Sequence, residues 1–209
     1  MQPRVAPQHR RPSPAAGPEG NEHLTAMTGV VLLIGFAVEG FTVLEIHRLI
    51  WLHFALGFLL IGPVLLKIGS VMYRFARYYM RSDQYVRKGP PAPLLRILGP
   101  LVVLTSVAVL GTGVMLAVVG PGGQGSWMFL HKASFVLWFG VMTIHVVAYA
   151  PRLPRLLRGD RVGARPGPAA APGGPARYLA LTGALAGGVL VAALAMHLSN
   201  AWNGGFAFH

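Results

Sequence analysis

Five apolar stretches in this chain are each long enough to cross a lipid bilayer as an α-helix. About 20 helical residues cross a hydrocarbon core that is about 30 Å thick. The stretches cover residues 24–46, 49–73, 96–119, 127–150 and 178–198. Only 11% of the 209 residues are charged, whereas soluble domains carry about 25%. The sequence therefore predicts an all-α integral membrane protein.

The basic residues are distributed unevenly between the two sides of the membrane. Fifteen of the 18 Lys and Arg residues precede the first span or lie in the loops after spans two and four. Because cytoplasmic loops are enriched in Lys and Arg, this predicts a multi-pass cell-membrane protein with a cytoplasmic N-terminus and an outside C-terminus. The net charge of +12 then reflects topology, and we expect no nucleic-acid partner.

The composition of the intervening segments predicts four regions. Residues 1–22 are rich in Pro, Arg, Gln and Gly, which is typical of a disordered tail. Residues 23–152 are predicted to form a four-helix transmembrane bundle, in which a proline run forbids a continuous helix through the loop 74–95. Residues 153–177 resemble a flexible Pro/Gly/Arg-rich linker. Residues 178–209 are expected to form a fifth, tethered transmembrane helix with a short outside tail.

Histidine is the strongest candidate metal ligand, because the chain contains no cysteine. His131 and His145 are fourteen residues apart in the fourth span, so they face nearly the same direction at levels about 21 Å apart. His53 enters the second span at about the same depth as His131. Two imidazoles at equal depth on facing helices suit the two axial positions of a haem iron. We therefore predict an outer haem b between His53 and His131.

A second, inner haem b is predicted at the level of His145. His23 borders the first span on the same side and completes this site if that helix begins a turn before residue 24. Lys67 lies fourteen residues after His53, so its ammonium group is placed to pair with a propionate of the inner haem. Arg74 and Arg77 are alternatives, although positive-inside anchoring also explains them.

The remaining histidines are weaker candidates. His47 lies at the tip of the first hairpin and is the nearest substitute for His53. His197, near the outside end of the fifth span, is a rival outer ligand. His9 and His209 lie in the tails and are expected to bind nothing.

Other residues in the spans suit a haem site but also suit ordinary packing. Small residues that leave space near the ligands are Gly57, Gly111, Gly113 and Gly140. Large side chains between the two levels of the fourth span are Phe135, Trp138 and Met142. Glu39 is costly inside hydrocarbon, which favours a proton-handling role or a polar contact. Tyr73, Tyr78 and Tyr79 are most simply an interface belt, with a quinone contact as the alternative.

The positions of these histidines resemble a known family. One His opens span one, one lies early in span two, and two lie fourteen residues apart in span four. This arrangement is similar to the dihaem b-type cytochrome subunits of membrane formate dehydrogenases and nickel-iron hydrogenases, in the bacterial cytochrome b561 group. The resemblance covers about residues 20–152. It implies that His53 with His131 and His23 with His145 hold two haems, and that electrons pass between an outward-side redox partner and a quinone near the inner haem.

The sequence thus favours an electron-transfer subunit of an oxidoreductase complex, with lipid, a quinone and a redox partner subunit as its partners. No constellation of its own for nucleophilic or acid–base catalysis is apparent. Two alternatives stay open: a stand-alone haem-dependent reductase of an outer acceptor, and a haem-free helical anchor or assembly protein.

Overall fold

The described part of the chain is almost entirely helical and contains no strand. The computed structural model describes residues 18–88, 93–152 and 174–203. Within these ranges, five helices are long and apolar enough to cross a membrane. They are α1 (Pro18–Leu44), α2 (Ile46–Tyr79), α4 (Pro93–Val119), α5 (Gly125–Tyr149) and α7 (Gly174–Ala195). The prediction of an all-α integral membrane protein is confirmed.

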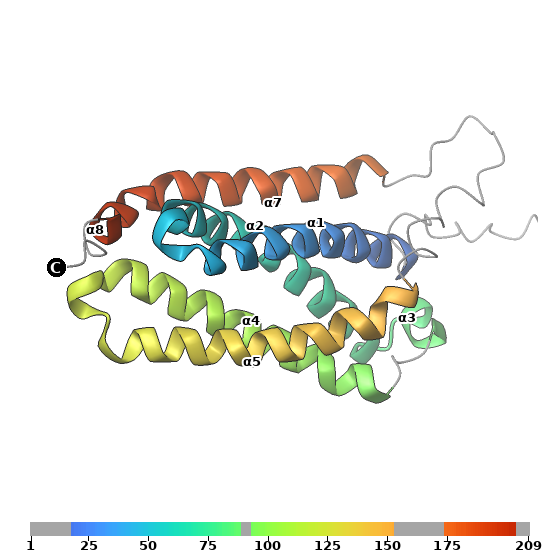
Figure 1. The fold of residues 1–209 in the computed structure, drawn as a ribbon. Coiled ribbons are helices and arrows are strands. Elements are labelled where there is room, and N and C mark those ends of the chain that lie inside the picture. Colours follow the sequence, from blue (N-terminus) through green and yellow to red (C-terminus); the bar gives the residue numbers. More distant parts are fainter. Residues whose placement is uncertain (1–17, 89–92, 153–173, 204–209) are drawn as a thin grey trace, which may run out of the picture.

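Short helical segments lie at the two ends of the bundle (Figure 1). At one end, which we call the turn end, α1 meets α2 at Glu45, and η2 (Pro121–Gly123) separates α4 from α5. After α7, η4 (Met196–Ser199) and α8 (Asn200–Asn203) also lie there. The opposite end, which we call the α3 end, carries α3 (Asp83–Lys88) and η3 (Ala150–Arg152). The turn end corresponds to the side that the charge pattern predicts to be outside.

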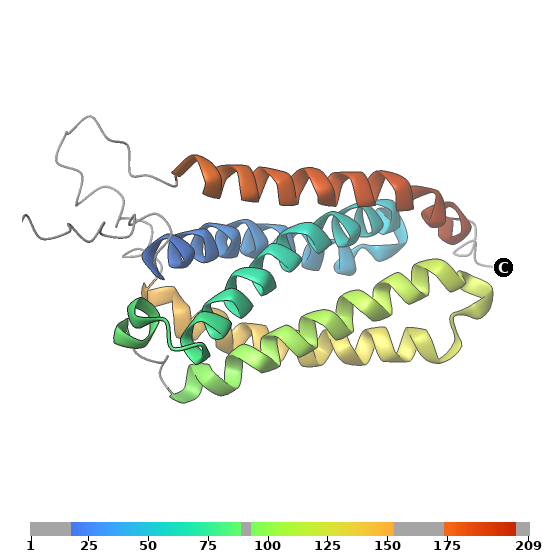
Figure 2. The same cartoon turned by 180° about the vertical axis from the view of Figure 1, so that it is seen from behind.

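The membrane-length helices form two groups that meet at α2. Helix α2 packs most extensively against α7 and next against α1, whereas α4 and α5 pair with each other as an antiparallel hairpin. Figures 1 and 2 show α1 and α7 on one side of the molecule and the α4–α5 hairpin on the other, while α2 crosses from beside α7 at the turn end toward the hairpin at the α3 end. Among its contacts with other long helices, α5 packs chiefly on α4. Its exposed apolar side chains suit contact with lipid.

Helix α7 is an integral part of the bundle, whereas the sequence suggested a helix only tethered to it. A Cβ atom at Gly62 of α2 would collide with the backbone of Ala184, and one at Gly188 of α7 would collide with that of Leu59. Small residues that let two backbones approach closely are a common means of packing membrane helices. The hydropathy of the span did not reveal this contact, because the lipid-facing and protein-facing sides are both apolar.

Helix α1 begins before the predicted start of the bundle. The boundary at residue 22 of the expected disordered tail is wrong, because the helix already includes Pro18, and residues 1–17 lie outside the described residues. Polar contacts with α2 hold this first part of α1: Asn21 Nδ2 donates to the Ser70 carbonyl oxygen at 3.0 Å, and Glu22 pairs with Arg74 at 3.0 Å. His23 is consequently inside the helix, as the predicted inner site requires.

Helix α2 also extends beyond its predicted span. It runs for 34 residues, about 51 Å at the usual rise, and its last turns replace the first part of the loop expected at 74–95. The proline run begins only at residue 90, so no proline interrupts the helix between residues 74 and 79. After it, α3 places the buried Tyr85 against Tyr73, with ring centroids 6.3 Å apart.

The segment after α7 closes the turn end. Trp202 of α8 is buried with Ile50 of α2 and Leu116 of α4 in one apolar cluster. The expected outside tail is therefore helical as far as Asn203, and residues 204–209 lie outside the described residues. Of the expected linker, residues 174–177 belong to α7, and 153–173 likewise lie outside the described residues.

Candidate functional site

Helices α2 and α5 run in the same direction and place polar side chains at the same two levels. His53 and Lys67 are fourteen residues apart on α2, as are His131 and His145 on α5. At the turn end, the rings of His53 and His131 lie next to each other in an edge-to-face arrangement. Toward the α3 end, Lys67 is close enough to His145 for their charges to interact. The structure thus brings together His53 with His131, and Lys67 with His145, at the predicted depths.

The separation of His53 and His131 suits two ligands on one metal ion. Their ring centroids are 6.4 Å apart, and the ring planes are inclined at 76°. An imidazole nitrogen binds a first-row transition metal at about 2.0–2.1 Å. Because this nitrogen lies about 1.1 Å from the ring centre, two imidazoles on opposite sides of a metal ion have centroids about 6.3 Å apart.

Hydrogen bonds on α1 determine which nitrogen of His53 carries its proton. The Thr42 hydroxyl donates to the Glu39 carbonyl oxygen at 2.6 Å. With its one proton used, Thr42 Oγ1 accepts from the Nδ1–H of His53 at 2.9 Å. The Oε1 atom of Glu39 lies 3.1 Å from the same nitrogen. The lone pair of the neutral ring is consequently on Nε2, the nitrogen left for a metal.

His131 is oriented in the same way by α4. The Thr112 hydroxyl donates to the Ala108 carbonyl oxygen at 2.7 Å, so it accepts from His131 Nδ1–H at 3.2 Å. Gly113 provides the space for this ring, since a Cβ atom there would lie 3.1 Å from Cε1 of His131. Metal-binding histidines usually donate their second ring N–H to such an acceptor. With Nδ1 hydrogen-bonded in this way, each of the two histidines at the turn end can offer Nε2 to a metal.

The level toward the α3 end is organised differently. Lys67 Nζ donates to the Thr25 carbonyl oxygen, and it lies 2.9 Å from the position of a Cβ at Gly29. His145 packs against Tyr149, with ring centroids 4.7 Å apart. Its Nδ1 is buried and makes no hydrogen bond within the described part of the chain. A hydrogen bond of the kind that orients His53 and His131 is thus missing at this nitrogen.

His23 lies on α1 near the α3 end and is half-buried. The predicted inner site required the first helix to begin before residue 24, and His23 does lie inside α1. The pairing of His23 with His145 stays a prediction, because the ring contact described for His145 is that with Tyr149.

Aromatic side chains fill the space between the two levels. Trp138 of α5 is buried, and its Nε1 donates to Ser106 Oγ of α4 at 3.1 Å. Phe36 of α1 meets Trp138 edge to face, with centroids 4.7 Å apart, and Phe135 stacks on its other side at 6.3 Å. The proposed role of Phe135 and Trp138 beside a porphyrin stays a prediction. These rings do connect α1 to the α4–α5 hairpin.

The rival histidines have other surroundings. His197 is exposed, and its Nδ1 lies 2.7 Å from the carbonyl oxygen of Leu194 in its own helix. His47 is exposed at the first turn. His9 and His209 lie outside the described residues. The geometry therefore favours His53 over both alternatives as the partner of His131.

The small residues near the ligands also differ in their surroundings. A Cβ atom at Gly57 would lie 3.3 Å from Glu39 Oε1, so this glycine makes room for the carboxylate. A Cβ atom at Gly111 or Gly140 would have no heavy atom of the described residues within 4 Å, apart from its own helix backbone and chain neighbours.

Sequence reasoning missed the two threonines that orient the histidines. Thr112 lies eight residues before Gly120, and His131 lies six residues after Gly125, so counting from the turn places both at a similar depth. That count was a usable signal for Thr112. Thr42 offered no such signal, because its contact with His53 depends on how α1 and α2 meet at Glu45.

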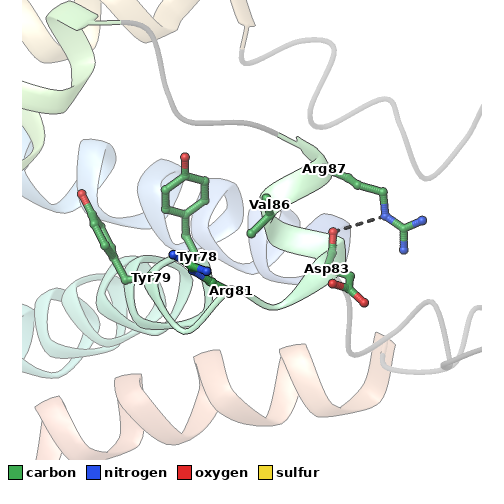
Figure 3. Close-up of a pocket in the computed structure, with 6 residues that line it drawn as sticks. All are labelled: Tyr78, Tyr79, Arg81, Asp83, Val86 and Arg87. Carbon is green, nitrogen blue, oxygen red and sulfur yellow. Dashed lines mark hydrogen bonds between the residues drawn. The ribbon is translucent and has the colours of Figure 1, made fainter.

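A surface pocket at the α3 end involves two of the predicted belt tyrosines (Figure 3). Its volume is about 620 Å³. The lining residues are Tyr78, Tyr79, Arg81, Asp83, Val86 and Arg87. In Figure 3 the Arg87 side chain extends away from the tyrosines, and its Nε donates to the Asp83 carbonyl oxygen at 3.2 Å. The charged groups thus do not converge on one point in the pocket.

The donor set at the turn end fits a haem. Within residues 18–88, 93–152 and 174–203, no three or more His, Asp or Glu side chains are grouped to hold a metal ion. A haem iron already has four porphyrin nitrogens and needs only two axial ligands from the protein. His53 and His131 could supply two such nitrogens, since their ring centroids are 6.4 Å apart.

No protein-family model matches this sequence, and no curated protein or solved structure matches it either. Its function therefore has to be argued from the chemistry of the site.

Proposed function

We propose that this protein is a b-type cytochrome of the cell membrane that transfers electrons between a redox partner and the quinone pool. It would act as an electron-transfer subunit of an oxidoreductase complex. His53 and His131 hold one haem b near the turn end, and His23 and His145 hold a second toward the α3 end. When bound, each haem supplies a centre that accepts and releases single electrons.

The pairing of His53 with His131 carries the proposal. Their centroid separation of 6.4 Å agrees with that of two imidazoles on opposite sides of one metal ion. Each Nδ1–H has an acceptor on a neighbouring helix, Thr42 or Thr112. A pair of histidines that only packed together would not need both rings held in the same tautomer with Nε2 left over.

The second haem is supported by the equal spacing on α2 and α5. His145 lies one fourteen-residue interval from His131, and Lys67 reaches its vicinity from α2. The ammonium group of Lys67 has the charge to pair with a propionate, and it donates a hydrogen bond to the neutral Thr25 carbonyl oxygen. His23 supplies the remaining ligand from α1.

The membrane orientation and the partners in this proposal rest on the charge pattern and the family resemblance. The positive-inside bias places the N-terminus and the α3 end in the cytoplasm, and the turn end outside. The resemblance to dihaem cytochrome subunits adds a redox partner subunit on the outer side and a quinone near the inner haem. Lipid surrounds the exposed apolar side chains of the five helices.

The haem content of the purified full-length protein tests this function. We expect a reduced-minus-oxidised spectrum with a b-type band, and two haems per chain in a pyridine assay. One haem per chain would remove the His23–His145 site and retain the His53–His131 site. A colourless preparation that is fully folded would contradict the proposal and favour an anchor or assembly protein.

The electron acceptor is tested with the reduced protein. Rapid reoxidation by a short-chain quinone analogue, and slow reoxidation by a ferric chelate, would support transfer to the quinone pool. The opposite order of rates would favour a stand-alone reductase of an outer acceptor.

A further inference from the structure

We propose that Glu39 is a positioning residue for His53 that makes it a stronger electron donor than His131, and thereby lowers the reduction potential of the turn-end haem. This inference rests on the proposed function, because it concerns a haem held by these two histidines. It assigns a role to the carboxylate that lies within the first membrane span.

The carboxylate of Glu39 reaches His53 across the α1–α2 interface. Its Oε1 lies 3.1 Å from Nδ1 of His53, and the two side chains are only 16% and 22% exposed, respectively. Gly57, one turn after His53 on α2, leaves the space that Oε1 occupies, since a Cβ there would lie 3.3 Å away. The contact therefore depends on residues from both helices.

The two histidines consequently have different partners. The Nδ1 atom of His53 lies near the hydroxyl oxygen of Thr42 and the carboxylate of Glu39, whereas the groups described at His131, the Thr112 hydroxyl and the Val109 backbone, are neutral. In its ionised form Glu39 would be the stronger partner, because hydrogen bonds to ionised acceptors are about twice as strong as those between neutral groups.

A carboxylate acceptor changes the chemistry of a ligating imidazole. When the second N–H of such a ring is bonded to a carboxylate, the ring becomes a more basic ligand. A more basic ligand and a nearby negative charge both favour the ferric state over the ferrous state. Glu39 is therefore expected to make the turn-end haem harder to reduce than His53 and His131 alone would.

Burial of a carboxylate inside a membrane span supports a functional role. An acidic side chain within hydrocarbon is costly unless it is paired. Oε2 of Glu39 is buried and makes no hydrogen bond with the described residues, so Oε1 makes the polar contacts through which this side chain acts. A purely structural link between α1 and α2 would be met by Thr42 alone.

The test is a potentiometric titration of full-length haem-loaded protein, with Glu39→Gln compared with wild type. Glutamine keeps the length and an acceptor oxygen but removes the charge. At a fixed ambient potential, we expect the ferrous-to-ferric ratio of the turn-end haem to rise about tenfold, which corresponds to about 59 mV for a one-electron couple. The electron paramagnetic resonance signal of that haem should also shift, and haem per chain should stay unchanged.

Glu45→Gln is the matched control, because Glu45 is exposed on the same side of the bundle and α1 ends just before it. Its potentials should equal those of wild type. A Glu39→Gln protein with full haem content and wild-type potentials would overturn the inference and leave the proposed function intact. A wild-type protein without haem would instead overturn the proposed function.

Glu39→Asp decides the outcome if Glu39→Gln fails to retain haem. Aspartate keeps the charge on a shorter side chain, so haem binding should return in part, with a potential nearer to that of wild type. If Glu39→Asp also lacks haem, while Glu45→Gln retains it, the carboxylate is required only for folding and the inference is wrong.

Discussion

The two levels of the bundle have the same spacing but different polar networks. At the turn end, the rings of His53 and His131 are neighbours. The Thr42 hydroxyl on α1 accepts a hydrogen bond from His53, and the Thr112 hydroxyl on α4 accepts one from His131. Toward the α3 end, the residue of α2 near His145 is Lys67, and His145 Nδ1 makes no hydrogen bond with the described residues. A repeat of fourteen residues therefore fixes the depth of a side chain, whereas its partners depend on the neighbouring helices.

Packing also distinguishes the two levels. The turn end is closed by a buried apolar cluster of Ile50, Leu116 and Trp202, which joins α2, α4 and α8. Helix α2 carries both Ile50 and His53, so one helix links the apolar cluster to the ligand pair. A histidine that packed helices and hydrogen bonds already hold in place needs little rearrangement to bind a metal. We therefore expect the turn-end site to bind haem more tightly than the α3-end site.

The largest expected effect is at the turn end. His131→Ala should abolish the turn-end haem, because one axial nitrogen and its hydrogen bond to Thr112 are both lost. The haem content should fall by one equivalent per chain in a pyridine assay. His197→Ala is the control, since His197 is exposed and bonded within its own helix. A His131→Ala protein with the wild-type spectrum would contradict the assignment of this level.

The corresponding change at the other level separates the two sites. His145→Ala should remove the α3-end haem and leave the spectrum of the turn-end haem intact, because His131 and His145 are about 21 Å apart along α5. Low-temperature difference spectra of the two variants should add up to the wild-type spectrum. Retention of both haems in His145→Ala would mean that the second haem, if present, has another ligand.

A smaller effect is expected from the threonine that orients His131. Thr112→Val removes the acceptor of Nδ1–H, and loss of such a partner typically weakens a metal site about 10- to 100-fold. The rate of haem transfer to a soluble apo-haem protein measures the change. Thr143→Val is matched to it, because Thr143 is exposed and bonds only to its own helix at Phe139. Equal transfer rates in both variants would argue against an orienting role.

The smallest effect is expected at Lys67. Lys67→Met retains most of the side-chain volume but removes the charge that would pair with a propionate, a contact worth about 1 kcal/mol when partly solvated. Binding at the α3-end site should weaken about fivefold, without change at the turn end. Lys132→Met, at an exposed position of α5, is the control. A loss confined to the turn-end haem would show that the levels are wrongly assigned.

Much of the site could be predicted by counting residues from the turns. The positions of the α1–α2 and α4–α5 connections are enough to predict that His53 and His131 lie at the same depth. The structure places these two residues side by side. The same count placed Lys67 at the level of His145. The acceptors Thr42 and Glu39 were not predicted as a pair on one nitrogen, because that contact depends on the rotation of α1 about its axis.

The fold was predictable to a similar extent. The five spans and the all-helical class follow from hydropathy. The start of α1 and the packing of α7 on α2 could not be predicted in this way. The start of α1 depends on contacts of Asn21 and Glu22 with α2, and local composition alone suggested a tail. The docking of α7 depends on the matched backbones at Gly62 and Gly188.

The sequence by itself determined that the chain has five helices long and apolar enough to cross a membrane, and at what levels along them His53, His131 and His145 lie. Transfer of about 20 apolar residues into hydrocarbon strongly favours a spanning helix, and the helical rise then sets the levels. Only the tertiary structure decided which faces meet, which ring nitrogen is left for a metal, and that the fifth helix packs on α2. Lipid and protein interior are equally apolar, so a span's composition does not specify which of its sides meets a neighbouring helix.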